Sequence, residues 1–234
     1  MANDSAEFVY SGTDNLEVMA EAQKYNRFLV DLVVKYRAAA VKTLDFGAGI
    51  GTFSELVKGR DPNRTVDCLE VDAKQAEVLQ RKGFRNFTRS EDIPDGTYDY
   101  IYSLNVFEHI EDDFAAAREA HRILREGGRL FVYVPAFSVL FGSMDRKVGH
   151  FRRYSRARLV DIVAGAGFQV QTDYYVDSLG FLATLVYNAG SRQDGSINKD
   201  SVRMYDRFVF PMSRMLDVVT SRLLGKNAVI VATK

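Results

Sequence analysis

The chain has 234 residues, with 31 Lys and Arg against 31 Asp and Glu, so its formal net charge is zero. A hydrophobic content of 47% is too high for a disordered chain and is typical of a globular protein with a buried core. The balanced charge argues against the extended basic surface that nucleic-acid binding requires. The single cysteine excludes an internal disulfide and a zinc site built from cysteines.

The first forty residues predict a helical segment. Asp14 and Glu17 have the spacing of a capping box, and apolar or aromatic residues then recur at helical spacing from Tyr25 to Tyr36. The amino-terminal residues are acidic, without the apolar stretch of a signal peptide. No uncharged stretch reaches the roughly 18–20 apolar residues of a membrane span. We therefore expect a cytoplasmic protein without stable membrane insertion.

Strands and helices alternate over the next hundred residues, which predicts an α/β protein with a doubly wound parallel sheet. Expected strands cover residues 41–46, 65–71, 87–90, 98–103 and 129–134, and expected helices cover 52–58, 73–82 and 112–124. The pattern then changes. A helix over 156–166, a strand over 169–176, a helix over 179–187, a loop over 190–199, a long amphipathic helix over 201–224 broken near Pro211, and a final strand over 228–233 are expected.

The most informative segment is the glycine-rich turn between the first strand and its helix, where Asp45 precedes Gly47, Gly49 and Gly51 at alternate positions. Glu70 ends the next strand, where a carboxylate can accept hydrogen bonds from two ribose hydroxyls. A dinucleotide fingerprint has the form G-x-G-x-x-G, but here the third glycine comes one position early. Asp45 would repel a pyrophosphate and attract an ammonium group. The turn therefore suits S-adenosylmethionine (SAM) better than NAD.

This turn resembles motif I of the class I SAM-dependent methyltransferases. Further segments resemble motifs of that family in the same order: Glu70, residues 92–94 with 98–101, residues 104–110, and residues 122–128, where Glu126 replaces the usual proline. The resemblance implies a mostly parallel seven-stranded sheet of order 3-2-1-4-5-7-6 with strand 7 antiparallel. Residues 1–40 would form an N-terminal helical lid. Residues 41–234 would form the SAM-binding domain, with substrate-side elements at 136–155 and a helical insertion at 178–225.

The resemblance also implies a set of cofactor-binding residues. Gly47, Ala48 and Gly49, with Asp45 and Gly51 beside them, would surround the methionine part of SAM. Glu70 would bind the ribose, Val71 would pack on the adenine, and Ser90, Glu91 or Asp92 would face its amino group. Asn105 and Val106 would close over the cofactor. Tyr25 and Asn26 would reach it from the lid, although Tyr25 also fits plain core packing.

Methyl transfer needs a base only where the acceptor must lose a proton. His109 follows the fourth strand, and His150 lies in a cluster that also holds Asp145, Arg152, Arg153 and Tyr154. We expect His150 or His109 to act as the base or to bind substrate. Arg152 or Arg153 would pair with an anionic group, and Asp145 and Tyr154 would contribute to substrate binding. The alternatives are structural: His109 could order its turn, and the cluster could be a solvated helix approach. No metal site is expected.

The pattern as a whole predicts a SAM-dependent methyltransferase that acts on oxygen or nitrogen of a small-molecule acceptor and releases S-adenosylhomocysteine. An NAD-dependent oxidoreductase is the first alternative, against which the early third glycine argues. A non-catalytic SAM-binding partner subunit is the second, against which the complete motif set argues. The apolar segment 208–224 fits core packing, a homodimer interface, a hydrophobic tunnel or a membrane-facing patch.

Overall fold

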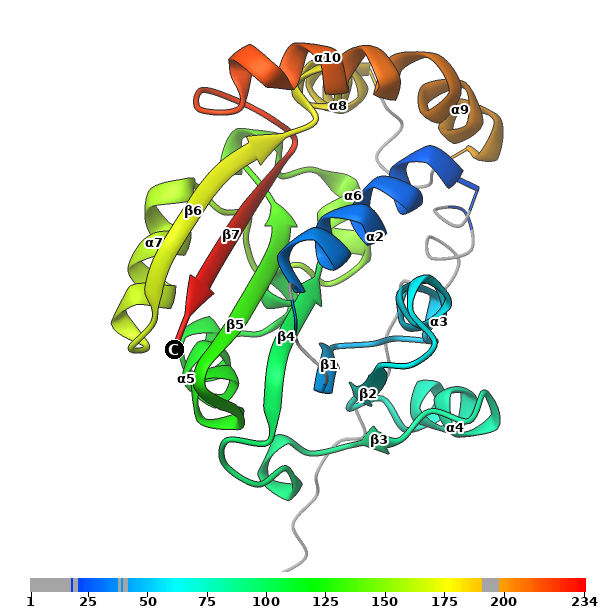
Figure 1. Cartoon of the computed structure of the whole chain (residues 1–234). Coiled ribbons are helices and arrows are strands. Elements are labelled where there is room, and N and C mark those ends of the chain that lie inside the picture. The colour runs from blue at the N-terminus through cyan, green and yellow to red at the C-terminus, as the bar shows by residue number, and fades with distance from the viewer. Residues whose placement is uncertain (1–17, 19–20, 38, 40–41, 191–197) are drawn as a thin grey trace, which may run out of the picture.

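The computed structural model describes residues 18, 21–37, 39, 42–190 and 198–234, and a seven-stranded sheet is its central element (Figure 1). The strand order is β3-β2-β1-β4-β5-β7-β6, which confirms the predicted order. Strand β7 runs antiparallel to both β5 and β6, and the other pairs are parallel. The strands are β1 Lys42–Phe46, β2 Thr65–Leu69, β3 Asn86–Phe87, β4 Tyr98–Leu104, β5 Leu124–Pro135, β6 Gln169–Val176 and β7 Asn227–Thr233.

Helices cover both faces of the sheet and its upper edge in Figure 1. The α-helices are α2 Gln23–Arg37, α3 Thr52–Arg60, α4 Ala73–Arg81, α5 Asp113–Ile123, α6 Ser143–Lys147, α7 Arg156–Gly165, α8 Ser178–Gly190, α9 Lys199–Met204 and α10 Phe210–Thr220. Short 3-10 helices span Ser90–Asp92 (η1), Phe107–His109 (η2) and Ser138–Leu140 (η3), and a π-helical turn, η4, spans Tyr205–Val209. Side chains of Asp72, Asp112, Ser155 and Asn198 cap α4, α5, α7 and α9.

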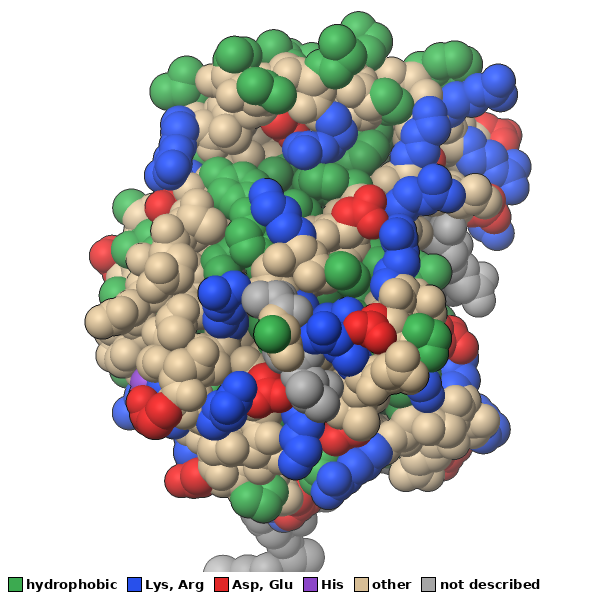
Figure 2. Space-filling view, viewed as in Figure 1, with side chains coloured by type: hydrophobic (Ala, Val, Ile, Leu, Met, Phe, Trp, Pro, Cys, Tyr) green, Lys and Arg blue, Asp and Glu red, His purple; other side chains and the backbone are tan. Residues whose placement is uncertain are grey.

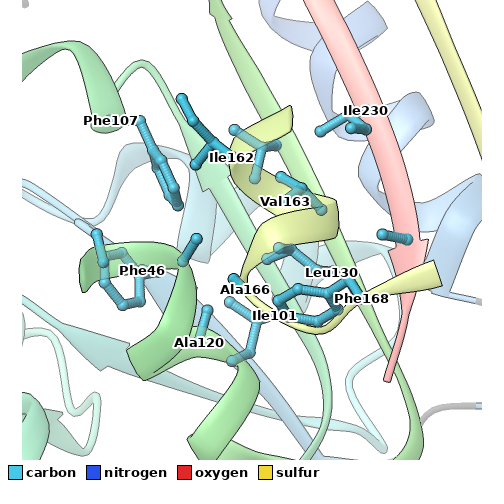
Figure 3. Close-up of a cluster of buried hydrophobic side chains, with 14 of the residues drawn as sticks. Phe46, Ile101, Phe107, Ala120, Leu130, Ile162, Val163, Ala166, Phe168 and Ile230 are labelled. Carbon is cyan, nitrogen blue, oxygen red and sulfur yellow. The ribbon is translucent and has the colours of Figure 1, made fainter. Parts of the chain in front are cut away.

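The central strands are buried on both faces because their side chains alternate between two cores. On one face, Ile101 and Leu130 pack against residues of α5 and α7, such as Ala120 and Val163 (Figure 3). On the other face, Tyr102 packs with side chains of α2, α3 and α4. The carboxyl ends of the parallel strands meet at the edge of the sheet that α6 and α8–α10 cover, where ligands bind in folds of this kind.

The break expected near Pro211 in the helix 201–224 is confirmed: the segment is divided into α9, η4 and α10, and Pro211 stands in the first turn of α10, where it cannot donate the backbone hydrogen bond of a continuous helix. Other local expectations differ from the structure. Strand β5 begins five residues earlier than expected, and α6 was not expected. The proposed cap Asp14 lies outside the described residues. Within the described part of the chain, no helix combines the length and apolarity needed to cross a membrane.

Candidate functional site

The glycine turn after β1 has a backbone that only small residues fit. Gly47 has φ of +82°, and a Cβ atom there would lie 2.4 Å from Cγ2 of Val106. Gly49 and Gly51 also have positive φ values, of +57° and +82°. The turn therefore brings bare backbone up to the loop after β4, and a ligand can approach without a side chain in the way. The predicted contact of this turn with the methionine part of SAM stays a prediction.

Glu70 lies next to this turn at the end of β2. Its Oε2 accepts a hydrogen bond from the backbone N–H of Gly49 at 2.8 Å, and its Oε1 accepts one from Asp72 at 2.9 Å. Burial raises the pKa of Glu70, while these amide hydrogen bonds oppose the shift. Val71 beside it is 58% exposed, which is unusual for an apolar side chain next to a buried carboxylate. Glu70 presents a fixed hydrogen-bond acceptor, as the ribose hydroxyls of a nucleoside require. Val71 presents an open apolar surface, as the base requires.

The remaining predicted nucleoside contacts lie on η1. Glu91 and Asp92 are exposed and Ser90 is half-buried, so all three are accessible to an adenine amino group. Asn105, with φ of +55°, and the half-buried Val106 begin the loop after β4. These residues lie in the order predicted for the residues around a cofactor. Each individual contact with the cofactor stays a prediction.

Asp45 has partners within the protein. Its Oδ2 accepts hydrogen bonds from Ser54 Oγ at 2.6 Å and from the Tyr102 hydroxyl at 2.8 Å. Burial raises its pKa to about 7, although both hydrogen bonds oppose that shift. The carboxyl group thus joins α3 to β4 through its Oδ2 atom. The expected contact of Asp45 with an ammonium group stays a prediction.

Tyr25 and Asn26, which the sequence placed in the lid, are both buried on α2. Ala48 on the glycine turn is partly buried. The Tyr25 hydroxyl lies 2.9 Å from that of Tyr133 on β5, and its backbone N–H donates to Oδ1 of Asp206 at 2.8 Å. Tyr25 is therefore a packing residue that fixes α2 over the edge of the sheet. Asn26 makes its own contacts within the protein.

Four side chains from two loops form a polar cluster after β4 and β5. The Nδ1 atom of His150 lies 2.7 Å from Oδ1 of Asp145, and its Nε2 atom lies 3.8 Å from Oε1 of Glu108. The ring centroids of His109 and His150 are 4.5 Å apart. The backbone N–H of Phe151 donates to the carbonyl of Glu108 at 2.8 Å and joins the two loops. The structure therefore brings together the two histidines that the sequence selected.

The four groups of this cluster differ in acidity. Burial opposes the ionisation of Asp145, but hydrogen bonds from His150 and Arg153 outweigh it and lower its pKa to about 2. Burial raises the pKa of Glu108 to about 8. Burial, and then the neighbouring His150, lower the pKa of His109 to about 4. His109 is thus a neutral imidazole and a weak base at pH 7, and the ionised Asp145 lies beside His150.

The arginines of this region are already paired. The Arg153 guanidinium donates to both carboxylate oxygens of Asp145, at 2.9 and 3.0 Å, and is nearly inaccessible. Arg152 donates to the carbonyls of Ile110 and Glu111 and pairs with Asp113. The expected pairing of either arginine with an anionic acceptor is therefore not supported. A buried bidentate pair is an anchor for Asp145 and, through it, for His150.

Tyr154 is also structural in this arrangement. Its hydroxyl donates to the carbonyl of Phe107 at 3.0 Å and lies 3.0 Å from Oδ2 of Asp113, and its ring is fully buried in the core beneath the cluster. The expected substrate contact of Tyr154 is not supported, because an inaccessible ring cannot touch an acceptor. It instead joins the loop after β5 to η2.

A cavity of about 360 Å³ lies beside the cluster. Its walls come from α2, α6, α8, α9 and η4, and most of them are apolar. Its polar side chains include residues far apart in sequence, among them Tyr25, Asp145, Arg153, Asp177, Tyr205 and Lys226. Asp145 belongs to both the cavity and the cluster.

Sequence reasoning missed three of these groups. Glu108 was assigned only to a motif, although its position beside His109 was a usable signal. Both of its carboxylate oxygens lack a hydrogen-bond partner among the described residues. Asp177 has φ of +67° and accepts a hydrogen bond from Tyr205, and Lys226 has its pKa lowered by burial while Asp177 opposes that shift. Nothing in the local sequence marks these two positions.

The same cluster can also hold a cation. One possible ligand atom from each of Glu108, His109 and His150 lies within 4.8 Å of the other two. Asp145 orients the His150 ring, as a carboxylate that hydrogen-bonds a metal-binding histidine does in many metal sites. The sequence predicted no metal site. The donor set therefore admits two uses, proton transfer and cation binding, that experiment can separate.

Comparison with known proteins adds to this geometry. Residues 16–173 match a family model described as a methyltransferase domain, which is more than half of the chain. The chain is 29% identical over 176 residues to a probable S-adenosylmethionine-dependent methyltransferase of Mycolicibacterium smegmatis, covering 72% of this chain and 66% of that protein. It is 31% identical over 103 residues to the ubiquinone biosynthesis O-methyltransferase of Pseudomonas aeruginosa, covering 40% and 44%.

A third relative, malonyl-[acyl-carrier protein] O-methyltransferase 1 of Ilyobacter polytropus, is 26% identical over 127 residues, covering 51% of this chain and 47% of that protein. The matched segments thus span 44–66% of these relatives' own length.

Solved structures share the fold. A possible histamine N-methyltransferase of Thermotoga maritima aligns with a TM-score of 0.63 at 15% identity, covering 94% of this chain and 95% of that one. The geranyl diphosphate C-methyltransferase of Streptomyces coelicolor aligns with a TM-score of 0.63 at 15% identity, covering 99% and 89%. The [4+2]-cyclase SpnF aligns with a TM-score of 0.61 at 19% identity, covering 91% and 82%. These neighbours carry out different reactions, so the likeness concerns the fold alone.

Proposed function

This chain belongs to the class I SAM-dependent methyltransferases, and within that family we propose that it methylates a hydroxyl oxygen of a small-molecule acceptor. The observation that carries the proposal is the Asp145–His150 pair, whose hydrogen bond spans 2.7 Å at the carboxyl edge of the sheet. A nitrogen acceptor that is already neutral would need no base, whereas a hydroxyl gains most from one. Two of the relatives described above are named O-methyltransferases, which supports the choice.

The cofactor would occupy the cradle at Gly47 and Gly49, with Glu70 at the ribose and Val71 against the adenine. Two observations support this placement: Glu70 is held at the edge of the turn by the Gly49 amide, and the Val71 side chain beside it is exposed. When bound, SAM supplies a methyl group already activated on a sulfonium. The chain must then supply alignment, exclusion of water and removal of the acceptor proton.

Removal of that proton falls to His150. Asp145 is ionised and accepts the Nδ1 proton, so the Nε2 lone pair is left free for the acceptor hydroxyl. As the new carbon–oxygen bond forms, the proton moves from the hydroxyl to Nε2, and the positive imidazole is stabilised by Asp145. Arg153 holds Asp145 in place from its other side. His109 is too weak a base for this step, because burial lowers its pKa to about 4.

The acceptor would combine an apolar body with a reactive polar end. The cavity that Asp145 shares with the cluster has mostly apolar walls from α8, α9 and η4 and polar groups at Tyr25, Asp177 and Lys226. A molecule that fills it with apolar atoms can present a hydroxyl toward the Asp145 side. Anionic groups on the acceptor are not required, because Arg152 and Arg153 are already paired.

The test uses SAM with a trideuterated methyl group. The protein is incubated with this donor and a cell extract containing metabolites and lipids, and mass spectrometry finds molecules that gain one trideuteromethyl group. NMR of the isolated product then identifies the methylated atom. The proposal requires a methyl group on oxygen, and a product methylated on nitrogen or carbon would refute it. Repeating the assay after dialysis against EDTA addresses the metal alternative, since a loss restored only by a divalent cation would contradict the role of His150 as a free base.

A further inference from the structure

The last helices expose an unusual amount of apolar surface. Ten of the fifteen large hydrophobic side chains that are exposed in the described part of the chain lie within residues 178–224. We call these ten the C-terminal apolar face: Leu182, Val186, Met204, Phe208, Met212, Met215, Leu216, Val218, Val219 and Leu223. Figure 2 shows hydrophobic side chains gathered along the top of the molecule, over α8–α10. Val218 is 82% exposed and Met215 is 78% exposed.

Helix α10 has the reverse of the usual amphipathic arrangement. Its buried side chains include the polar Ser213 and Asp217, while its methionines and valines point to solvent. The Asp217 carboxylate accepts hydrogen bonds from the backbone N–H groups of Asp177 and Ser178, each at 2.9 Å, and Ser213 Oγ accepts one from Leu179 at 3.0 Å. These bonds satisfy the free amides at the start of α8. The helix pair is thus held by polar contacts, and its apolar side chains are left outside.

Positive charge accompanies this face. Residues 199–224 hold five cations, Lys199, Arg203, Arg207, Arg214 and Arg222. The same residues hold three carboxylates, of which Asp206 and Asp217 are buried. Three of the arginines are already paired, Arg203 with Glu21 and Asp200, Arg214 with Asp217, and Arg222 with Asp173. Lys199 and Arg207 have no carboxylate partner among the described residues. The Asp206 carboxylate accepts the amides of Lys24 and Tyr25 at the start of α2. Figure 2 shows Lys and Arg side chains at both ends of the apolar top.

We propose that the C-terminal apolar face docks on the surface of an anionic phospholipid bilayer. Apolar side chains would enter the boundary between headgroups and acyl chains, and the cations Lys199 and Arg207 would meet lipid phosphates. A second copy of this chain is a poorer occupant, because a two-fold interface would bury Lys199 and Arg207 of both copies without supplying carboxylates to pair with them. No helix of the described residues is suited to span a bilayer, so docking would be peripheral. Met204 also lines the cavity, which places the cavity next to the docked face.

Cosedimentation with vesicles tests this proposal on the full chain, without any methyl acceptor. Vesicles of phosphatidylcholine alone are compared with vesicles holding about one-third phosphatidylglycerol. We expect clear binding to the anionic vesicles, weaker binding to the neutral ones, and loss of the difference in high salt. Failure to bind either kind of vesicle would refute the proposal and would leave the methyltransferase assignment untouched.

Variants identify the surface. Met215→Ser, Val218→Ser and Val219→Ser combined should weaken binding to anionic vesicles about tenfold or more. Leu223→Ser should weaken binding, whereas its matched control, Leu56→Ser on α3 and far from the face, should not. Arg207→Gln should weaken binding to anionic vesicles about fivefold and leave binding to neutral vesicles unchanged. These side chains are exposed, so thermal unfolding should confirm an intact fold. A stable dimer that the triple variant dissociates, without vesicle binding, would overturn the proposal.

Discussion

The Nδ1 atom of His150 lies 2.7 Å from Oδ1 of Asp145, and the same carboxylate is held from its other side by the Arg153 guanidinium at 2.9 and 3.0 Å. One buried carboxylate thus fixes the tautomer and the direction of a histidine that follows it by five residues. The arrangement accounts for the buried Arg153 in a charge-rich segment. It also makes His150 the group on which catalysis depends in our proposal.

Replacement of Gly47 tests the cofactor cradle. Gly47→Ala should weaken SAM binding by at least about tenfold, or about 1.4 kcal/mol, because the new Cβ would meet Val106 at 2.4 Å and because φ is +82°. Gly59→Ala on α3 is the matched control, since a Cβ there meets nothing within 4 Å. Isothermal titration calorimetry with SAM measures both. Equal affinities of the two variants would show that the cofactor binds elsewhere.

Tyr154→Phe tests whether Tyr154 is structural. Removal of the hydroxyl leaves the Phe107 carbonyl without its donor and should lower the free energy of unfolding by about 1–2 kcal/mol, measured in urea. Because the ring is inaccessible, the KM for the acceptor should not change. A raised KM at normal stability would instead support the original expectation that Tyr154 binds substrate.

Glu108→Gln should make stability less dependent on pH. Burial raises the pKa of Glu108 from 4.5 to about 8, so the folded state holds a proton that the unfolded chain releases between these values. Its contribution to the free energy of unfolding therefore falls as pH rises from about 4.5 to 8 and is constant above that range. The glutamine variant should lose the part of the pH dependence of the free energy of unfolding that Glu108 contributes. The part contributed by Asp45, whose pKa is also raised, should remain.

Thermal unfolding between pH 5 and 9 measures this dependence. Glu126→Gln is the control, because the Glu126 side chain is 89% exposed and should behave as wild type. If Glu108→Gln keeps the full wild-type slope, the carboxyl group of Glu108 ionises normally in the folded protein.

The architecture could be predicted from sequence because it rests on local and repeated signals. The glycines after Asp45 require positive φ values, and the strands of the sheet alternate with helices at regular spacing. The order of the sheet, including the antiparallel β7, followed from the family resemblance. The helix expected over 156–166 is α7, which the Ser155 side chain caps by accepting the Arg158 amide. These features depend on neighbouring residues, which a sequence displays.

The site was harder to predict because its contacts join distant segments. The sequence placed Arg152 and Arg153 correctly beside the site, but it could not show that Asp145 and Asp113 already hold them. It could not show the partners of Asp45 either, because Ser54 and Tyr102 come from other elements. The apolar segment 208–224 has the composition of a core helix, and only the buried Ser213 and Asp217 show that its apolar side faces outward.

The rate of methyl transfer by His150→Gln tests the central claim most directly. The comparison uses the acceptor recovered in the labelling experiment, saturating SAM, and His121→Gln as the control, since His121 packs on Phe168 away from the cluster. We predict that His150→Gln lowers kcat about 100-fold or more while the Kd for SAM stays unchanged, and that His121→Gln retains its rate. A His150→Gln variant with the wild-type kcat would contradict the account, because His150 is the side chain proposed to accept the proton from the acceptor hydroxyl.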